Sequence, residues 1–310
     1  MTDALVGWVK RSGTHRSKDQ RGRGGFRFAS PTLRVPRSRR RLPAALLSIV
    51  IAAGAAVMIA PYVWLVVNSL KTVEDFSRHP YSLWPNPLDL TAYGRAFTLG
   101  RVGIYLGNSL FYALVATAVQ LFLDSLAAFA FARMEFRGRG AAFTLLLATM
   151  MLPGAVTLIP TYLIVVHLGI ADSRLGVLLP GFAGAFGIFM LRQFFLNIPA
   201  DLEDAARIDG CSAFGIYSRI ILPLAKPALI TLGLFIFIGA WSDFLWPLVV
   251  LTDWDLYPIT VGIASFRSEA WIFWNSVFAG SVIASFPLIC LTVLAQRYII
   301  GGIALSGMKG

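Results

Sequence analysis

The sequence is poor in charged residues and rich in long hydrophobic runs. Charged side chains make up 14% of its 310 residues, whereas a soluble domain carries about 25%. Hydrophobic residues make up 57% of the chain, and mean hydropathy is +0.70. These residues are grouped in runs of about 18 or more, the length that crosses a bilayer as an α-helix. A water-soluble globular protein is therefore excluded, and the sequence predicts an all-α membrane protein with several spans.

Residues arranged for disulfide bonding, metal binding or nucleotide binding are also scarce. The two cysteines, Cys211 and Cys290, fall in different segments and set no disulfide framework. The three histidines lie far apart in the sequence, with no carboxylate or cysteine at the spacing of metal ligands. No lysine completes the GxxxxGK(S/T) pattern that cradles nucleotide phosphates. We therefore expect no enzyme activity, no metal site and no cofactor bound by this chain.

Positive charge is concentrated near the N-terminus. Of the 27 basic residues, 12 lie within residues 1–41, where only two acidic residues oppose them. Gly, Ser and Pro are frequent there, which predicts a disordered basic cytosolic tail whose charge allows contact with anionic membrane lipid. The arginines before Leu42 are similar to those of a twin-arginine export signal, but the apolar run that follows is longer than the hydrophobic region of a cleaved signal peptide, so an uncleaved membrane anchor is expected. A nucleic-acid partner is rejected, because the positive-inside rule accounts for the net charge of +11.

Six membrane spans are predicted, which together form one domain at 42–299 and leave a short cytosolic tail at 300–310. The spans lie at about 42–67, 107–131, 141–166, 175–195, 228–251 and 272–299. With this topology, 21 of the 27 basic residues fall in inner segments and 6 in outer ones. The bias predicts that both termini are cytosolic. Pro153 and Pro160 are expected to kink or break the third span near its outer end.

A polar segment, residues 197–226, separates the fourth and fifth spans. Its charged side chains cannot lie in hydrocarbon. Asp201 and the acids after it fit the first turn of a helix, where the helix dipole favours them, and Gly210 suits its end. Ser212 is placed to cap a second helix, which is expected to end before Pro223. The pattern predicts a cytosolic helix-turn-helix that contacts another protein.

The spacing inside this segment resembles a known loop. Asp204-Ala205-Ala206, three residues, Gly210, nine residues, Ile220, one residue and Leu222-Pro223 is similar to the EAA loop of ABC importer permeases. The fuller run resembles the carbohydrate branch, the MalG-like permeases, although that family usually has Glu where this chain has Asp204. The resemblance implies the six-span type I importer fold in the inner (cytoplasmic) membrane of a bacterial cell, with 197–226 as the coupling loop that docks on an ATPase. The residues that it implies in coupling are Glu203, Asp204, Ala205, Ala206, Asp209, Gly210, Ile220, Leu222 and Pro223.

The resemblance also implies partners. These are a second, MalF-like permease, two ABC ATPase subunits that hold ATP and Mg, and an extracellular or periplasmic solute-binding protein. The outer segment between spans five and six occupies the position of the loop that reaches into the binding protein in MalG-like permeases. Its implied docking residues are Trp254, Tyr257 and Arg267. An ordinary cluster of interfacial aromatic residues explains the same composition.

Two acids inside the predicted spans are candidates for the substrate path. Burying an ionisable group in a membrane is costly, so Asp124 and Asp243 each indicate a function. Asp243 lies between Trp241 and Trp246, and a carboxylate between aromatic rings suits a sugar, because the acid accepts hydroxyl hydrogen bonds. The alternative for Asp243 is a structural acid near the end of its helix. Asp124 could instead pair with Arg133 or with a partner subunit.

These observations favour one function and leave others open. The expected protein is the permease subunit of an ABC importer, forming half of the path for a sugar or a related polyol or glycerophosphate compound. One alternative keeps the importer but changes the cargo to a non-sugar solute such as an amino acid, a peptide or phosphate. A secondary transporter coupled to ions would need a chain of intramembrane acids and an inverted repeat. A membrane enzyme would need clustered titratable groups at one depth.

Overall fold

The computed structural model describes residues 44–266 and 274–307, and these residues form helices, turns and loops without a β-strand. The predicted tail at 1–41, Arg267 and the last three residues lie outside the described part. Contacts divide the chain into two units, Met1–Ala53 and Gly54–Gly310. From the first unit the structure describes only the start of helix α1, Ala44–Ser69. All contacts discussed below lie within the second unit.

Three single helices are long and apolar enough to cross a membrane. They are α1, α4 (Val102–Arg133) and α15 (Trp274–Gly307), with spanning segments at Ala45–Ser69, Val102–Arg133 and Trp274–Gln296. They correspond to the first, second and sixth predicted spans. Helix α15 continues past the predicted end at 299, to Gly307, although the sequence there is Gly-rich.

Three further spans are built from bent pairs of helices, which gives up to six in the described residues. Helices α5 (Arg139–Thr149) and α6 (Gly154–His167) meet at 103°. The break lies just before Pro153, near the middle of the predicted span 141–166 and not near its outer end, and Pro160 is accommodated inside α6. The segment 174–181, formed by α7 (Arg174–Leu178) and η1 (Leu179–Gly181), meets α8 (Ala185–Leu196) at 42°.

The predicted fifth span, 228–251, is not one helix. Helix α12 (Lys226–Ser242) ends at Asp243, whose backbone is extended, and a separate α13 (Leu245–Val250) follows. At its other end α12 meets the helical segment 213–224 at 80°. Two hydrogen bonds stabilise the break at Asp243. Its side chain accepts the N–H of Trp246, and its carbonyl accepts the hydroxyl of Thr260, a residue 17 positions away that a local sequence pattern does not reveal.

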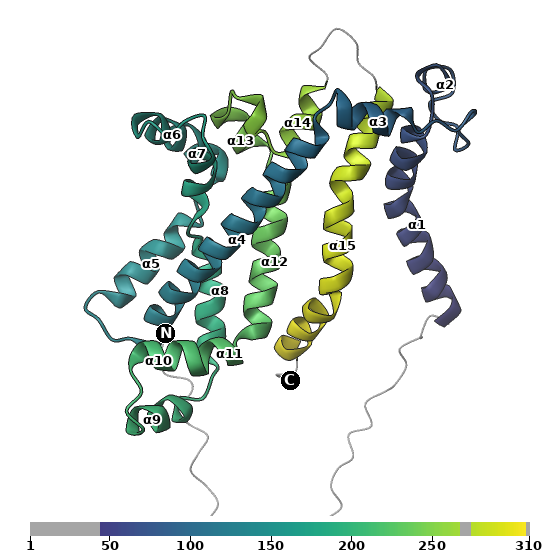
Figure 1. The fold of residues 1–310 in the computed structure, drawn as a ribbon. Helices are drawn as coiled ribbons and strands as arrows, with labels where there is room; N and C mark the ends of the chain where they lie inside the picture. Colours follow the sequence, from purple (N-terminus) through teal and green to yellow (C-terminus); the bar gives the residue numbers. More distant parts are fainter. Residues whose placement is uncertain (1–43, 267–273, 308–310) are drawn as a thin grey trace, which may run out of the picture. The chain divides into compact units, whose positions relative to one another are not determined.

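Short helices connect these elements (Figure 1). They are α2 (Val73–Arg78), α3 (Thr91–Thr98), η3 (Trp254–Leu256) and α14 (Ile259–Ser265) between spans, and α9 (Asp201–Ile208), α10 (Ala213–Ile216), a π-helical turn η2 (Tyr217–Ile221) and α11 (Leu222–Leu224) in the polar segment.

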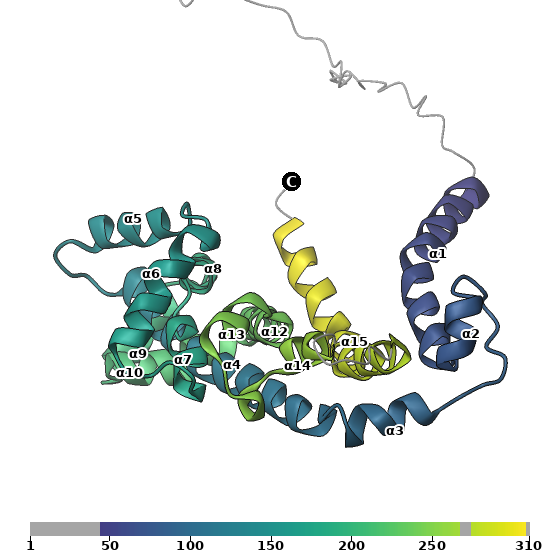
Figure 2. The ribbon, with the colours of Figure 1, turned by 90° about the horizontal axis from the view of Figure 1, so that it is seen from above.

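The core forms where α4 packs against α8 and α12, and α12 also contacts α15 (Figure 2). Large side chains such as Leu191, Phe195 and Leu232 are fully buried there. The outward faces of the long helices are apolar as well, and Met58 on α1 is 81% exposed. Apolar side chains both inside and outside are what a helix bundle in a lipid bilayer requires, so the predicted all-α membrane fold is confirmed.

Candidate transport cavity and coupling loop

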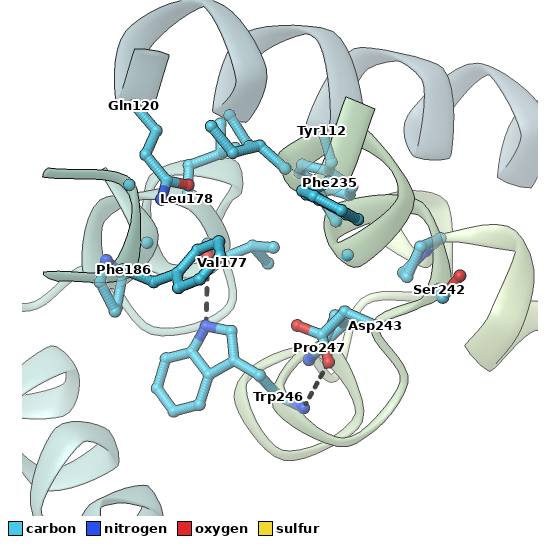
Figure 3. Close-up of a pocket in the computed structure, with 18 of the residues that line it drawn as sticks. Tyr112, Gln120, Val177, Leu178, Phe186, Phe235, Ser242, Asp243, Trp246 and Pro247 are labelled. Carbon is cyan, nitrogen blue, oxygen red and sulfur yellow. Dashed lines mark hydrogen bonds between the residues drawn. The ribbon is translucent and has the colours of Figure 1, made fainter. Parts of the chain in front are cut away.

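A cavity of about 590 Å³ lies between α4, the α7–η1 segment, α8, α12 and α13 (Figure 3). Its walls are mostly apolar, and the polar groups are few. Its principal side chains are Tyr112, Gln120, Val177, Leu178, Phe186, Phe235, Asp243 and Trp246. A concave apolar site with a few convergent polar groups is the usual form of a small-molecule site.

Asp243 reaches this cavity because α12 ends there. The last turn of α12 and the extended residue after it turn the carboxylate inward, so that one oxygen faces the open centre while the other lies toward α13 (Figure 3). The backbone amide of Trp246 lies 3.5 Å from Oδ1 of Asp243, and Thr260 donates its hydroxyl to the backbone carbonyl of Asp243 at 2.6 Å. The carboxylate is therefore held by its own loop and keeps capacity to accept hydrogen bonds from a ligand.

The two tryptophans beside Asp243 lie in different places. Trp246 lines the cavity and donates its indole N–H to the carbonyl of Val177 at 3.2 Å, which joins α13 to α7. Trp241 is buried outside the cavity, stacks on Phe237 at 5.8 Å between ring centroids and donates to the carbonyl of Ala284 at 3.2 Å. Trp246 is therefore the member of the predicted pair that can contact a bound solute in this arrangement.

Asp124 is fully buried behind the cavity wall. Its Oδ1 accepts the backbone N–H of Gly184 at 2.8 Å, and its Oδ2 lies 3.3 Å from Nε2 of Gln120. Gly184 is the residue before α8, so the carboxylate caps a helix that the α7–α8 bend leaves open. A side chain at Gly187 would overlap the same carboxylate. The idea that Asp124 pairs with Arg133 is wrong, because Arg133 contacts other groups.

The polar segment folds as two short helices. Gly210 ends the first with φ = 81°, a left-handed conformation that suits glycine, and Ser212 caps the second by accepting the N–H of Gly215 at 3.2 Å. The expectation that this second helix ends before Pro223 is wrong. The turn at 217–221 is π-helical, with Leu222 donating to the carbonyl of Tyr217. This wider turn admits a residue that lacks an N–H and lets the helix reach Leu224.

Glu203 and Ala206 of the first helix face inward. Glu203 is 4% exposed and pairs with Arg133 at the end of α4, with 2.8 Å between its Oε1 and Nε of Arg133. Arg133 also donates to the carbonyls of Phe195 and Ile198 at 2.7 and 2.6 Å. Among the implied coupling residues, Glu203 therefore attaches the loop to α4 and α8 within this chain.

Other implied coupling residues remain at the surface. Asp204, Ala205, Asp209, Gly210 and Pro223 are exposed, while Ile220 and Leu222 are partly buried. Two apolar side chains project beside them: Ile208 is 88% exposed and Phe214 is 65% exposed. We define Leu202, Ile208, Phe214 and the exposed acids Asp201, Asp204 and Asp209 as the loop patch. Sequence reasoning missed Ile208 and Phe214, although an apolar residue at the end of a polar helix was a visible signal.

The predicted docking segment is fixed to the top of α4. Asn108 donates its amide to the carbonyls of Asp255 and Tyr257 at 2.7 and 3.1 Å, and Tyr112 donates to that of Leu256 at 2.9 Å. Trp254 is 50% exposed on this segment, and Tyr257 is partly buried. Arg267 lies outside the described residues. Asn108 is a polar residue within a predicted span, so its position could have signalled this contact.

Asp172, in the turn between α6 and α7, forms hydrogen bonds with the loop after α13. Its carboxylate accepts the backbone N–H groups of Thr252 and Asp253 at 2.7 and 2.8 Å, and the hydroxyl of Thr252 at 2.6 Å. These hydrogen bonds, led by that of the Thr252 side chain, hold the pKa of Asp172 below its usual value. The turn between α6 and α7 is thus attached to the loop after α13. Within the described ranges, no three His, Cys, Asp or Glu side chains are grouped to hold a metal ion.

Comparison with known proteins gives a consistent result. The family model described as the inner membrane component of binding-protein-dependent transport systems matches residues 124–304. The arabinooligosaccharides transport system permease protein AraQ of Halalkalibacterium halodurans is 31% identical over 268 residues, covering 86% of this chain and 96% of AraQ. The sn-glycerol-3-phosphate transport system permease protein UgpE of Brucella abortus is 34% identical over 259 residues, covering 81% of this chain and 92% of UgpE.

A solved structure shares the fold. The crystal structure of a bacterial ABC transporter involved in the import of the acidic polysaccharide alginate contains a chain that matches with a TM-score of 0.74 and 24% identity, covering 82% of this chain and 95% of that one. The family match spans more than half of the sequence and includes the three bent helix pairs, Asp124, Asp243 and the polar segment 197–226. The chain belongs to the family of inner membrane components of binding-protein-dependent transport systems, the permease subunits of ABC importers.

Proposed function

We propose that this permease forms half of the path by which an ABC importer moves a saccharide or a related polyhydroxylated solute across the inner membrane. The observation that carries the proposal is the carboxylate of Asp243, which faces an apolar cavity between Trp246 and Phe235 (Figure 3). Sugar hydroxyls donate to carboxylates, and the C–H faces of a sugar ring pack on aromatic rings. The name of AraQ, a permease of an arabinooligosaccharide system, supports the same class of cargo.

The proposed machinery has four kinds of partner. A second permease would complete the path, and two ATPase subunits would bind ATP and Mg. A solute-binding protein would deliver the cargo to the side that carries Trp254. The loop patch would dock on an ATPase, because its exposed apolar side chains are surrounded by acids and project from two short helices. In this arrangement the loop patch and both termini are cytosolic.

The path is tested by uptake through the importer reconstituted with its partners in liposomes. Asp243→Ala should lower uptake of arabinotriose by about 10-fold to 100-fold, the loss expected when a hydrogen bond to a charged group is removed. Glu135→Ala is the matched control, because Glu135 is an exposed acid between α4 and α5. Equal uptake by the two variants would contradict a role for Asp243 in the path.

The orientation is tested separately by labelling. Ile208→Cys places a thiol at the most exposed apolar position of the loop patch. In a background in which Cys211 and Cys290 are replaced by serine, an impermeant maleimide should label this thiol in inside-out vesicles and not in right-side-out vesicles. Addition of the ATPase subunits should then protect the thiol. Labelling in right-side-out vesicles would refute the cytosolic placement.

A further inference from the structure

We infer that the cavity selects against anionic cargo and favours a neutral polyhydroxylated solute, an inference that rests on the proposed function. Among its 19 lining residues, all within the described part of the chain, Asp243 is the one acidic or basic side chain. Lysine, arginine and histidine do not occur among them. A uronate, a sulfonate or a phosphate ester placed there would meet a carboxylate and no cation from this chain.

A second carboxylate adds to the acceptor character of the site. Asp124 lies directly behind the wall and accepts from Nε2 of Gln120, which itself lines the cavity. That contact uses one of the two N–H groups of the Gln120 amide, and its amide oxygen remains an acceptor. Together, Asp243 and Gln120 offer acceptor oxygens to a ligand, and neutral hydroxyl groups are the donors that match them.

The arginines on the surrounding helices are engaged elsewhere. Arg133 on α4 contacts Glu203 and two carbonyls. Arg174 on α7 lies 4.8 Å from the centroid of the Phe111 ring and contacts the side chain of Asn108 at 3.4 Å. Arg192 on α8 donates to a backbone carbonyl of α4 at 3.1 Å and lies 4.1 Å from an aromatic centroid on α5. None of the three lines the cavity, so none balances the charge of Asp243.

The apolar walls make this charge effective over the whole cavity. Between unit charges several ångströms apart, the interaction in a partly desolvated site is far stronger than in water, and a cleft with low-dielectric walls focuses the field. A cation and an anion of the same size should therefore differ in local concentration by about 10-fold or more.

The inference is tested by measuring that field directly in the assembled importer. Gly239 lines the cavity four residues before Asp243 on α12, and a Cβ added there meets nothing within 4 Å. In the background without Cys211 and Cys290, Gly239→Cys is treated with two methanethiosulfonate reagents of similar size, one carrying trimethylammonium and one carrying sulfonate. For each reagent, the rate of modification of the introduced cysteine is divided by the rate at which the same reagent reacts with 2-mercaptoethanol in solution. The thiolate fraction of the reporter then cancels in the ratio of the two reagents.

The normalised cationic-to-anionic ratio should exceed about 10 at Gly239→Cys and fall toward 1 when Asp243→Asn is added. Gly181→Cys, on another wall and also without a neighbour within 4 Å of its Cβ, should repeat the result. Ile208→Cys in the loop patch is the control, and its ratio should not respond to Asp243→Asn. A ratio of 1 or less in the cavity, or a ratio insensitive to Asp243→Asn, would overturn the inference.

A second measurement separates this inference from the proposed function. Uptake of neutral arabinotriose and of anionic trigalacturonate is compared in the same liposomes at saturating solute. If neither saccharide enters, the proposed function fails, whereas the reagent ratio still decides the charge of the cavity. If trigalacturonate enters as fast as arabinotriose, the permease carries saccharides but the selection against anions is wrong.

Discussion

The ion pair between Arg133 and Glu203 should be among the most important tertiary contacts of this chain for stability. Their side chains are 12% and 5% exposed, and Arg133 also donates to the carbonyls of Phe195 and Ile198. Arg133→Met leaves a buried carboxylate without its cation and removes the guanidinium donor from both carbonyls, of which that of Phe195 still accepts the N–H of Ile198. Breaking a buried pair in this way typically costs about 3–5 kcal/mol. Arg137→Met, at an exposed arginine just beyond α4, should change stability by less than about 0.5 kcal/mol.

The double variant Arg133→Met/Glu203→Met separates the net contribution of the ion pair from the cost of leaving Glu203 buried without its partner. Two apolar side chains of similar volume remove both buried charges, and such replacements are often neutral. The double variant should therefore recover about 2 kcal/mol or more relative to Arg133→Met alone. The assay is reversible unfolding in mixed micelles of dodecyl maltoside and sodium dodecyl sulfate. If Arg133→Met is no less stable than Arg137→Met, or if the second substitution recovers nothing, the pair does not hold the coupling loop.

Three further predictions concern backbone geometry and pH. Gly187→Ala should lower the free energy of unfolding by about 1–3 kcal/mol, because the new methyl group overlaps the buried carboxylate of Asp124 on α4. Gly181→Ala, measured in the same unfolding assay, should change it by less than about 0.5 kcal/mol. Gly210→Pro should uncouple ATP hydrolysis from uptake in the reconstituted importer, because proline cannot adopt φ = 81°, while an unchanged coupling ratio would refute the docking role. The lowered pKa of Asp172 means that its stabilisation is complete above the ordinary value of about 3.9 and is lost as pH falls through the lower folded-state value. Pepsin should therefore cleave near Thr252 increasingly as pH falls, and Asp172→Asn should remove that dependence.

Local features of the coupling loop could be predicted from the sequence because short-range rules decide them. Gly210 adopts the left-handed conformation expected of a helix stop, and Ser212 forms the expected cap. The break before Pro153 follows in the same way from the missing N–H and the restricted residue before it. Pro223 was misjudged, because a π-helical turn was not considered as a way to pass a proline.

The tertiary roles could not be predicted, because they depend on which helices become neighbours. A helix without interruption would separate Trp241 and Trp246 by about 140° around its axis. Pro247, four residues after Asp243, was an unused signal for the break, but which tryptophan then faces the cavity depends on the packing of the neighbouring helices. The partner of Glu203 lies 70 positions earlier in the chain, at Arg133. Asp124 was recognised as unusual inside a span, but its role as a cap on α8 depends on a bend that only the fold reveals.

Helix α4 runs without interruption for 32 residues, a rod of about 48 Å at 1.5 Å per residue. Near its start, Asn108 and Tyr112 donate hydrogen bonds to the segment that carries Trp254. Gln120 contributes to the cavity at mid-length, and Arg133 secures the coupling loop at the far end. In the proposed importer such a rod would act as a rigid lever, because tilting the end near Trp254 displaces the end near Arg133 without a relay of side chains. Arrival of cargo and engagement of the ATPase would then be two ends of one rigid-body movement.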